Sequence, residues 1–124
     1  YKLDHLVTFI NDYIPNSEVA KYFSCSDVTV LPYKTASQSG VMQIAYNFDI
    51  PVVTTNVGGL SEYIDDGATG ILLESNNPLK LSEVLYENFK NNNFKILLNN
   101  IKKYKKKFSW EYFIKGIDEI ITEL

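Results

Sequence analysis

A serine- and glycine-rich segment between two apolar runs is the part of the chain best suited to bind an anion. The run Val28–Leu31 is followed by a proline and a polar loop, and an apolar pattern with helical spacing begins near Gly40. Backbone amides at a helix start attract phosphate, and glycine lets a ligand approach the backbone closely. The residues that would line such a site are Ser37, Gln38, Ser39, Gly40 and Val41. Since serine is also an ordinary helix cap, spacing alone leaves both interpretations open.

The surrounding pattern predicts strands and helices in alternation. The predicted strands are Leu6–Ile10, Val28–Leu31, Pro51–Thr55 and Gly70–Leu73, and the predicted helices are 16–25, 39–48 and 60–64. Beyond Asn77 the chain is predicted to be helical, with a break at Asn91–Asn93 and a last helix capped by Ser109. Val28–Leu31 is apolar at nearly every position, which indicates a strand covered on both faces. Strands joined through helices form a parallel sheet, so the fold class is α/β with an all-helical C-terminal tail.

Two apolar stripes in the tail are expected to pack inward. One runs from Leu81 to Phe89 and the other from Phe94 to Phe108, both with helical spacing. A third apolar stripe continues without a break from Trp110 to Leu124.

Length and charge restrict the function classes. The chain has 124 residues, 45% of them hydrophobic, which suits a single domain. Lys plus Arg number 12 and Asp plus Glu number 15, so the net charge of −3 argues against nucleic acid as a partner. Every basic residue apart from His5 is a lysine. Phosphate recognition by this chain must therefore use backbone amides, hydroxyls or lysine.

Single residues exclude several chemistries. Cys25 is the only cysteine, which excludes an internal disulfide, and His5 is the only histidine and precedes the first predicted strand. Without a second histidine, a cysteine pair or a tight carboxylate cluster, a metal site is not expected. No apolar stretch approaches the length of about 20 residues that spans a membrane, and the N-terminus lacks the pattern of a signal peptide. We expect a cytoplasmic protein, and a first residue other than Met suggests a piece of a longer chain.

The segment Asp27–Leu73 resembles the C-terminal, donor-binding domain of retaining glycosyltransferases of the GT-B fold, in the large bacterial group-one or family-four class. The resemblance lies in the aspartate-led strand ending in Pro32 and Tyr33, the Ser39-Gly40 helix start, and the stretch PVVTTNVGGLSEYIDDGATGILL. It implies a Rossmann-like parallel sheet with flanking helices. It also implies transfer of a sugar from a nucleotide-diphosphate sugar to an acceptor in cell-surface polysaccharide or glycolipid synthesis, without a further cofactor.

The resemblance also implies that the chain is only part of the enzyme. The acceptor would bind an N-terminal domain outside this chain, the full enzyme could associate peripherally with a membrane, and the chain alone should be inactive. Six strands in the order 3-2-1-4-5-6 are typical of the family, and this chain would hold the third to the sixth. Leu6–Ile10 would then be separated from the other strands by a gap of two, and open sheet edges would favour self-association.

The family's site residues can be carried over only in part. The resemblance places the diphosphate at Ser39, Gly40 and Val41, with the donor sugar near Ser37 and Gln38. Family members carry two glutamates eight positions apart, and alignment on Pro51 places those positions at Ala36 and Ile44. Neither is acidic. No carboxylate clamp for the ribose is therefore expected.

Two further places could line the donor pocket. The loop Ile10–Tyr13 matches the position where the family recognises the nucleotide base, so that Asn11 and Tyr13 are candidates, although an ordinary solvent loop explains them equally. Tyr33 could line the pocket or cover the sheet edge. Glu62 is expected to be a helix-start carboxylate with a structural role. The lysine run Lys102–Lys107 is expected to be a solvated helix face, with contact to anionic lipid as the alternative.

Two other function classes fit the α/β pattern. A nucleotide-sugar epimerase of similar fold would need acid and base carboxylates and histidines that the chain does not show. A receiver-like or flavodoxin-like module would bind a partner or a nucleotide without catalysis. A receiver needs acidic residues at strand ends, and Asp27 lies at the wrong end of its strand.

Overall fold

The structure is a computed structural model that describes residues 3, 5–108 and 110–122. It confirms the α/β class and the all-helical tail. The elements in order are α1 (Asn16–Ser24), β1 (Thr29–Leu31), α2 (Gly40–Asn47), β2 (Val52–Thr55), the 3₁₀ helix η1 (Gly58–Glu62), β3 (Gly70–Leu73), α3 (Pro78–Lys90), α4 (Asn93–Tyr104), the 3₁₀ helix η2 (Lys105–Phe108) and α5 (Trp110–Thr122).

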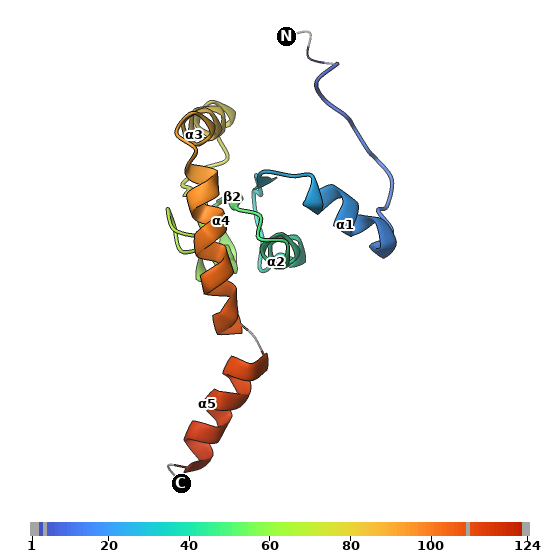
Figure 1. Cartoon of the computed structure of the whole chain (residues 1–124). Helices are drawn as coiled ribbons and strands as arrows, with labels where there is room; N and C mark the ends of the chain where they lie inside the picture. The colour runs from blue at the N-terminus through green and yellow to red at the C-terminus, as the bar shows by residue number, and fades with distance from the viewer. Residues whose placement is uncertain (1–2, 4, 109, 123–124) are drawn as a thin grey trace.

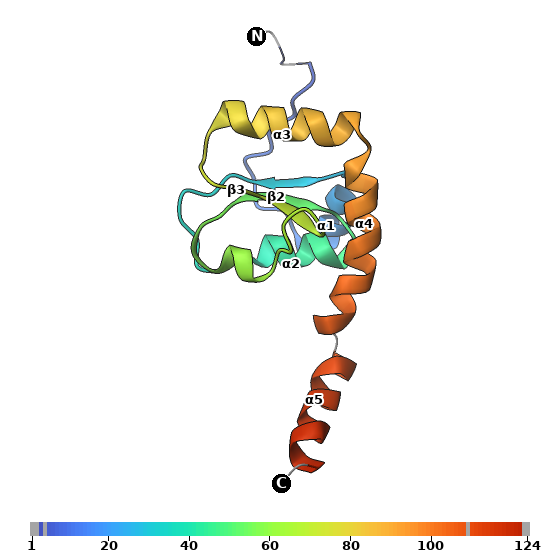
Figure 2. The same cartoon turned by 90° about the vertical axis from the view of Figure 1, so that its left-hand side faces the viewer.

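The three strands form a parallel sheet in the order β1-β2-β3. Val53 is the central register position, opposite Val30 of β1 and Ile71 of β3. The sheet lies between α3 on one face and α2 with η1 on the other (Figure 2). Three of the four predicted strands are therefore confirmed, in the layered arrangement that a strand covered on both faces requires.

The predicted strand Leu6–Ile10 is wrong in this chain. Apart from a turn at residues 5 and 6, the segment has no regular structure, and Leu6 and Phe9 are 71% and 81% exposed. An extended segment becomes a strand only when a neighbour satisfies its backbone donors and acceptors. Among the described residues the sheet holds only β1, β2 and β3, so no strand is placed to pair with this apolar run.

Side chains of the sheet alternate between two core clusters. Val52 and Leu31 pack with Met42, Leu60 and Ile101, which come from α2, η1 and α4. On the other face Val53 and Leu73 pack with Phe94 and Leu97 of α4 and with the half-buried apolar face of α3. This alternation follows from the period of two along a strand. Because α4 contributes to both clusters, it closes one end of the sheet (Figure 2).

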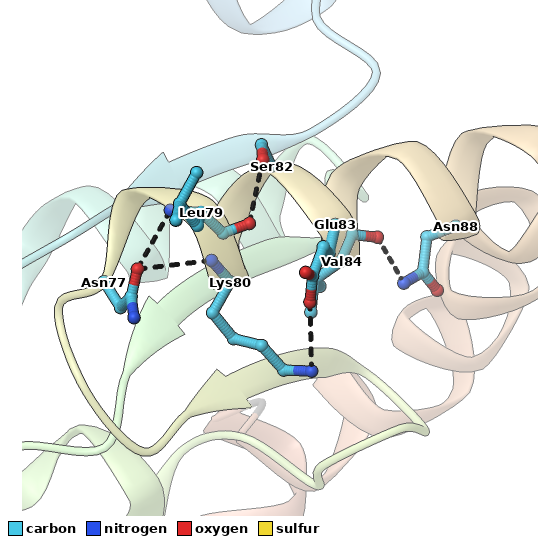
Figure 3. Close-up of polar contacts among 7 residues, drawn as sticks. All are labelled: Asn77, Leu79, Lys80, Ser82, Glu83, Val84 and Asn88. Carbon is cyan, nitrogen blue, oxygen red and sulfur yellow. Dashed lines mark hydrogen bonds and ion pairs between the residues drawn. The ribbon is translucent and has the colours of Figure 1, made fainter.

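The helical tail has its predicted break. Asn77 caps α3 by accepting hydrogen bonds from the amides of Leu79 and Lys80 (Figure 3). Asn92 lies between α3 and α4 with a φ of 54°, a left-handed conformation that asparagine tolerates better than most residues. The predicted cap Ser109 lies outside the described residues. The helix α5 extends away from the body of the molecule (Figures 1 and 2).

The two stripes expected to pack inward do so to different extents. In α4, Phe94, Leu97 and Ile101 are buried, which confirms the prediction. In α3 no residue is fully buried, and Phe89 at the end of its stripe is 50% exposed. The prediction is therefore wrong for Phe89, because α3 covers the sheet with only one side of a largely solvated helix.

An ion pair holds the start of η2 against the turn between α2 and β2. The Lys105 Nζ lies 2.6 Å from the Asp49 Oδ1, with side chains 36% and 24% exposed, and it donates to the Asn47 carbonyl at 3.3 Å. Asp49 itself has a φ of 61°. A small polar residue that tolerates the left-handed region is needed there.

Replacing the Asp49 carboxylate tests how much this ion pair contributes to the free energy of unfolding. We expect Asp49→Asn to lower the free energy of unfolding by up to about 1 kcal/mol, because asparagine keeps the backbone conformation and loses the charge. Glu83→Gln is the control, since the Lys80–Glu83 pair on α3 is 62% and 65% exposed with 3.4 Å between its charged atoms (Figure 3). Urea denaturation of both variants should show a measurable change for Asp49→Asn alone. Equal midpoints for the two variants would contradict the expectation.

Candidate functional site

The loops that follow the three strands meet at the carboxyl edge of the sheet. In Figure 2 the loops after β1, β2 and β3 lie together at the left, at the start of α2 and of η1, whereas α4 covers the opposite edge. Open α/β sheets bind ligands at the carboxyl edge. We call the residues between β1 and α2, Pro32 to Ser39, the donor loop, after the role that the family resemblance implies for them.

Ser39 is the N-cap of α2, as predicted. Its side chain is 7% exposed, and its Oγ accepts a hydrogen bond from the Met42 amide at 3.4 Å. The Tyr33 hydroxyl lies 3.4 Å from the same oxygen, so the two ends of the donor loop meet. The amides at the first positions of a helix have no carbonyl within the helix to bond. Gly40 and Val41 are exposed there, and a Cβ on Gly40 would meet no described atom within 4 Å.

Three polar side chains fix the backbone at the end of β1 and at the start of the donor loop. The Thr54 hydroxyl donates to the Leu31 carbonyl at 2.7 Å, and the Thr55 hydroxyl donates to the Tyr33 carbonyl at 2.5 Å. From the loop after β3, the Asn76 side-chain amide donates to the Pro32 carbonyl at 2.9 Å. Thr54 and Thr55 are fully buried, and their hydroxyls make hydrogen bonds to the backbone that a valine of similar shape could not make. The loop is therefore tied to β2 and to the end of β3.

Gly58 and Gly59 allow η1 to lie directly against the donor loop. A Cβ on Gly58 would stand 1.6 Å from the Ala36 carbonyl oxygen, and a Cβ on Gly59 would stand 2.7 Å from the Ser37 carbonyl oxygen. Gly58 also has a φ of 56°. The two glycines thus form the floor beneath Ala36 and Ser37.

The predicted site residues separate into two groups. The donor loop and the start of α2 bring together Tyr33, Ser37, Gln38, Ser39, Gly40 and Val41. Asn11 and Tyr13 are not part of this group. Their segment joins α1 at the end of the helix that lies farther from the sheet (Figure 1), and Tyr13 is 83% exposed. The predicted base-recognition loop therefore does not face the start of α2 in this structure.

Charge at this edge comes from few sources. Ala36 and Ile44, where the family places its glutamates, are half-buried and carry no carboxylate. Lys34 supplies an exposed ammonium group on the donor loop, and α2 directs the positive end of its dipole toward the same place. Glu62 is exposed at the end of η1. The arrangement favours an anion held mainly by backbone amides.

Sequence reasoning missed the residues that hold the donor loop. Thr54, Thr55 and Asn76 lie outside the serine- and glycine-rich segment, and Lys34 lies within the loop but is not among the predicted site residues. The available signal was the pair of threonines at the carboxyl end of an otherwise apolar strand. The described part of the chain holds no group of three His, Cys, Asp or Glu residues that could bind a metal ion, and no helix long and apolar enough to cross a membrane.

The sequence matches a known family over most of its length. The profile of the glycosyl transferases group 1 family matches residues 2–91. The chain belongs to this family. A glycosyltransferase of Methanocaldococcus jannaschii is 36% identical to this family member over 108 residues, which are 86% of the chain and 31% of that protein. A D-inositol 3-phosphate glycosyltransferase of Paenarthrobacter aurescens is 43% identical over 68 residues, which are 55% of the chain and 17% of that protein.

Solved structures show the same fold for this group 1 family member. The sucrose-phosphate synthase of Thermosynechococcus elongatus superposes with a TM-score of 0.76 at 23% identity, covering 98% of the chain and 31% of the synthase. The Anabaena protein HepE, in complex with UDP-glucose, superposes with a TM-score of 0.67 at 16% identity, covering 86% of the chain and 30% of HepE. The resemblance to the GT-B glycosyltransferases is thereby confirmed. The chain spans less than a third of each of these proteins.

Proposed function

We propose that this chain is the donor-binding part of a retaining glycosyltransferase, and that the start of α2 binds the diphosphate of a nucleotide sugar. Membership of the group 1 family supports the reaction class. HepE was solved with UDP-glucose, which supports a nucleotide-activated hexose as the donor class. The diphosphate itself, rather than a separate cofactor, would be the group that the protein holds.

The observation that carries the proposal is the fixed donor loop leading into an exposed helix start. Ser39 caps α2, Gly40 leaves open space, and Thr55 and Asn76 hold the loop backbone in place. When the bond to the sugar breaks, negative charge develops on the departing nucleoside diphosphate. The amides of Gly40 and Val41 and the helix dipole stabilise that charge without having to reorganise.

The rest of the enzyme would supply what this chain lacks. We propose that residues outside the chain bind the acceptor, a sugar or glycolipid in cell-surface polysaccharide synthesis, and complete the cleft. Attack on the same face that the leaving group vacates would retain the anomeric configuration. The chain spans about a third of the length of its relatives, which supports such a division between this chain and the rest of the enzyme. A cytoplasmic location, peripheral membrane association of the full enzyme and an inactive isolated chain belong to the same proposal.

Titration with nucleoside diphosphates tests the site. We expect UDP, GDP or ADP to shift the backbone amide NMR signals of Ser39, Gly40 and Val41. Ser39→Ala should weaken binding about fivefold, because removing one hydrogen bond at the cap loosens the first turn by about 1 kcal/mol.

The matched control for this variant is Asn77→Ala. It removes the N-cap of α3, a helix of the same chain, and should cost a similar stability of about 1 kcal/mol while leaving nucleotide affinity unchanged. If no nucleotide moves the α2 amides, or if both variants weaken binding equally, the diphosphate does not bind at the start of α2.

A further inference from the structure

Two hydroxyl groups meet where the donor loop enters α2. The Tyr33 hydroxyl lies 3.4 Å from the Ser39 Oγ, and the same Oγ accepts a hydrogen bond from the Met42 amide at 3.4 Å. Both distances are longer than the value of about 2.7 to 3.0 Å that is typical of such bonds. Hydrogen bonds in catalytic sites are often long before the ligand arrives and shorten when it binds. We call Tyr33 and Ser39 the hydroxyl pair.

The surroundings hold the Tyr33 side chain in the place that this contact needs. The Tyr33 carbonyl accepts a hydrogen bond from the buried Thr55 hydroxyl, and the Tyr33 amide donates to the Leu31 carbonyl at 2.8 Å. The ring is half-buried against the core cluster that contains Leu31 and Met42. Because the backbone and the ring are already ordered, the hydroxyl loses little conformational freedom when a ligand binds.

The hydroxyl pair has one proton more than its contacts use. Each hydroxyl group has one proton to donate, and only one of the two protons can lie between the Tyr33 and Ser39 oxygens. In its other contact the Ser39 oxygen is the acceptor, for the Met42 amide. Neither hydroxyl has a further partner among the described residues. One proton is therefore left to donate to a group from outside, although Ser39 is only 7% exposed.

Acid strength assigns the remaining proton to Ser39. A phenol is a stronger acid than an aliphatic alcohol and is therefore the better donor, so the Tyr33 hydroxyl donates to the Ser39 Oγ. Both lone pairs of that oxygen are then occupied, by Tyr33 and by the Met42 amide. Met42 lies in the first turn of α2, so an O–H bond that points away from its amide points out of the helix end. The exposed residues Gly40 and Val41 lie at the same end.

We propose that Ser39 donates its hydroxyl proton to an oxygen of the diphosphate, and that Tyr33 is a positioning residue that orients this hydroxyl. The inference rests on the proposed diphosphate site and adds a side-chain donor to its backbone amides. A hydrogen bond to an ionised acceptor is about twice as strong as one between neutral groups. Donation from Tyr33 polarises the Ser39 hydroxyl and makes it a better donor. Since the chain has no arginine, the pair supplies part of the recognition that a guanidinium group could supply.

Titration with inorganic pyrophosphate and with UDP tests the proposal. Tyr33→Phe keeps the ring and removes the hydroxyl, so it should weaken binding of both probes about threefold. Because Tyr33 acts through Ser39, adding Tyr33→Phe to Ser39→Ala should weaken binding no further than Ser39→Ala alone. The matched control is Tyr63→Phe, since Tyr63 is also half-buried against the same core cluster. It should leave both affinities unchanged.

Hydrogen exchange of the Met42 amide distinguishes positioning from a purely structural role. Tyr33→Phe leaves the Ser39 cap in place, so this amide should exchange as slowly as in the unchanged protein. Faster exchange that accompanies the loss of affinity would mean that Tyr33 only stabilises the helix start, which overturns the proposal.

The titrations also distinguish this proposal from the proposed function. Equal affinities of Tyr33→Phe and the unchanged protein, or a further loss in the double variant, overturn the role of Tyr33 and leave the diphosphate site intact. If the unchanged chain binds neither probe at the amides of Gly40 and Val41, the proposed function fails together with this inference.

Discussion

Gly58→Ala should destabilise the protein by more than about 3 kcal/mol, a large effect for the addition of one methyl group. The new Cβ would stand 1.6 Å from the Ala36 carbonyl oxygen and 2.8 Å from its carbonyl carbon. Backbone atoms must move to relieve this overlap, yet the donor loop is held by Thr55 and Asn76. Either η1 leaves the loop or the loop leaves the start of α2. In both cases nucleotide affinity should fall together with stability.

Substitutions at two other glycines distinguish the effect of the steric clash from the effect of the positive φ. Gly67 has a φ of 74°, but a Cβ there would meet no described atom within 4 Å, so Gly67→Ala should cost only about 1 to 2 kcal/mol. Gly40 has open space and a helical conformation, so Gly40→Ala should be neutral or stabilising by about 0.5 to 1 kcal/mol. Urea denaturation of the three variants gives the order. If Gly58→Ala costs no more than Gly67→Ala, η1 does not press against the donor loop.

Alkaline pH should reduce stability through Tyr46, by about 2 kcal/mol between pH 10 and pH 12. Burial raises the pKa of Tyr46 from 10.0 to about 12, and interactions with Tyr104 and Asp65 act in the same direction, whereas the hydrogen bond to Thr69 opposes them. The unfolded chain loses this proton near pH 10 while the folded protein keeps it. Stability is therefore complete below pH 10 and falls as the pH rises toward 12.

Tyr46→Phe isolates this contribution from those of the other tyrosines and the lysines. The variant loses the hydrogen bond that the Tyr46 hydroxyl donates to the Thr69 Oγ1 at 3.0 Å, so it should be about 1 kcal/mol less stable at neutral pH. Above pH 10, however, its stability should fall less steeply than that of the unchanged protein. Parallel slopes for the two proteins, measured by urea denaturation across this range, would show that Tyr46 is not the buried group responsible.

Local patterns were sufficient for most of the fold. Val28–Leu31, Pro51–Thr55 and Gly70–Leu73 are short apolar runs bounded by turn residues, and all three became neighbouring strands. Leu6–Ile10 has the same local character and did not become a strand. Strand formation depends on a neighbour at a distance, which no window of sequence describes. Local pattern predicts which segments favour extended structure, whereas pairing with a neighbour decides which of them form strands.

The candidate site shows the same division between local and distant causes. The cap at Ser39 and the exposed Gly40 follow from residues that are adjacent in sequence, so they were predictable. The hydrogen bonds from Thr55 to Tyr33 and from Asn76 to Pro32 join residues 22 and 44 positions apart. These depend on register and loop geometry, which the sequence does not display. Asn11 and Tyr13 were assigned through a family position whose supporting strand does not form in this chain.

Because α4 packs across one end of the sheet, the residues that hold the core and the residues that line the candidate site lie at opposite ends of the strands. The helix α4 contributes Ile101 to one core cluster and Phe94 and Leu97 to the other. It lies across the amino ends of the strands, whereas the donor loop lies at their carboxyl ends (Figure 2). Exposed residues of the loop, such as Ser37 and Gln38, can be exchanged without touching the packing that α4 provides. If the start of α2 binds a nucleotide sugar as proposed, a library confined to these positions can explore donor preference while both core clusters keep their residues.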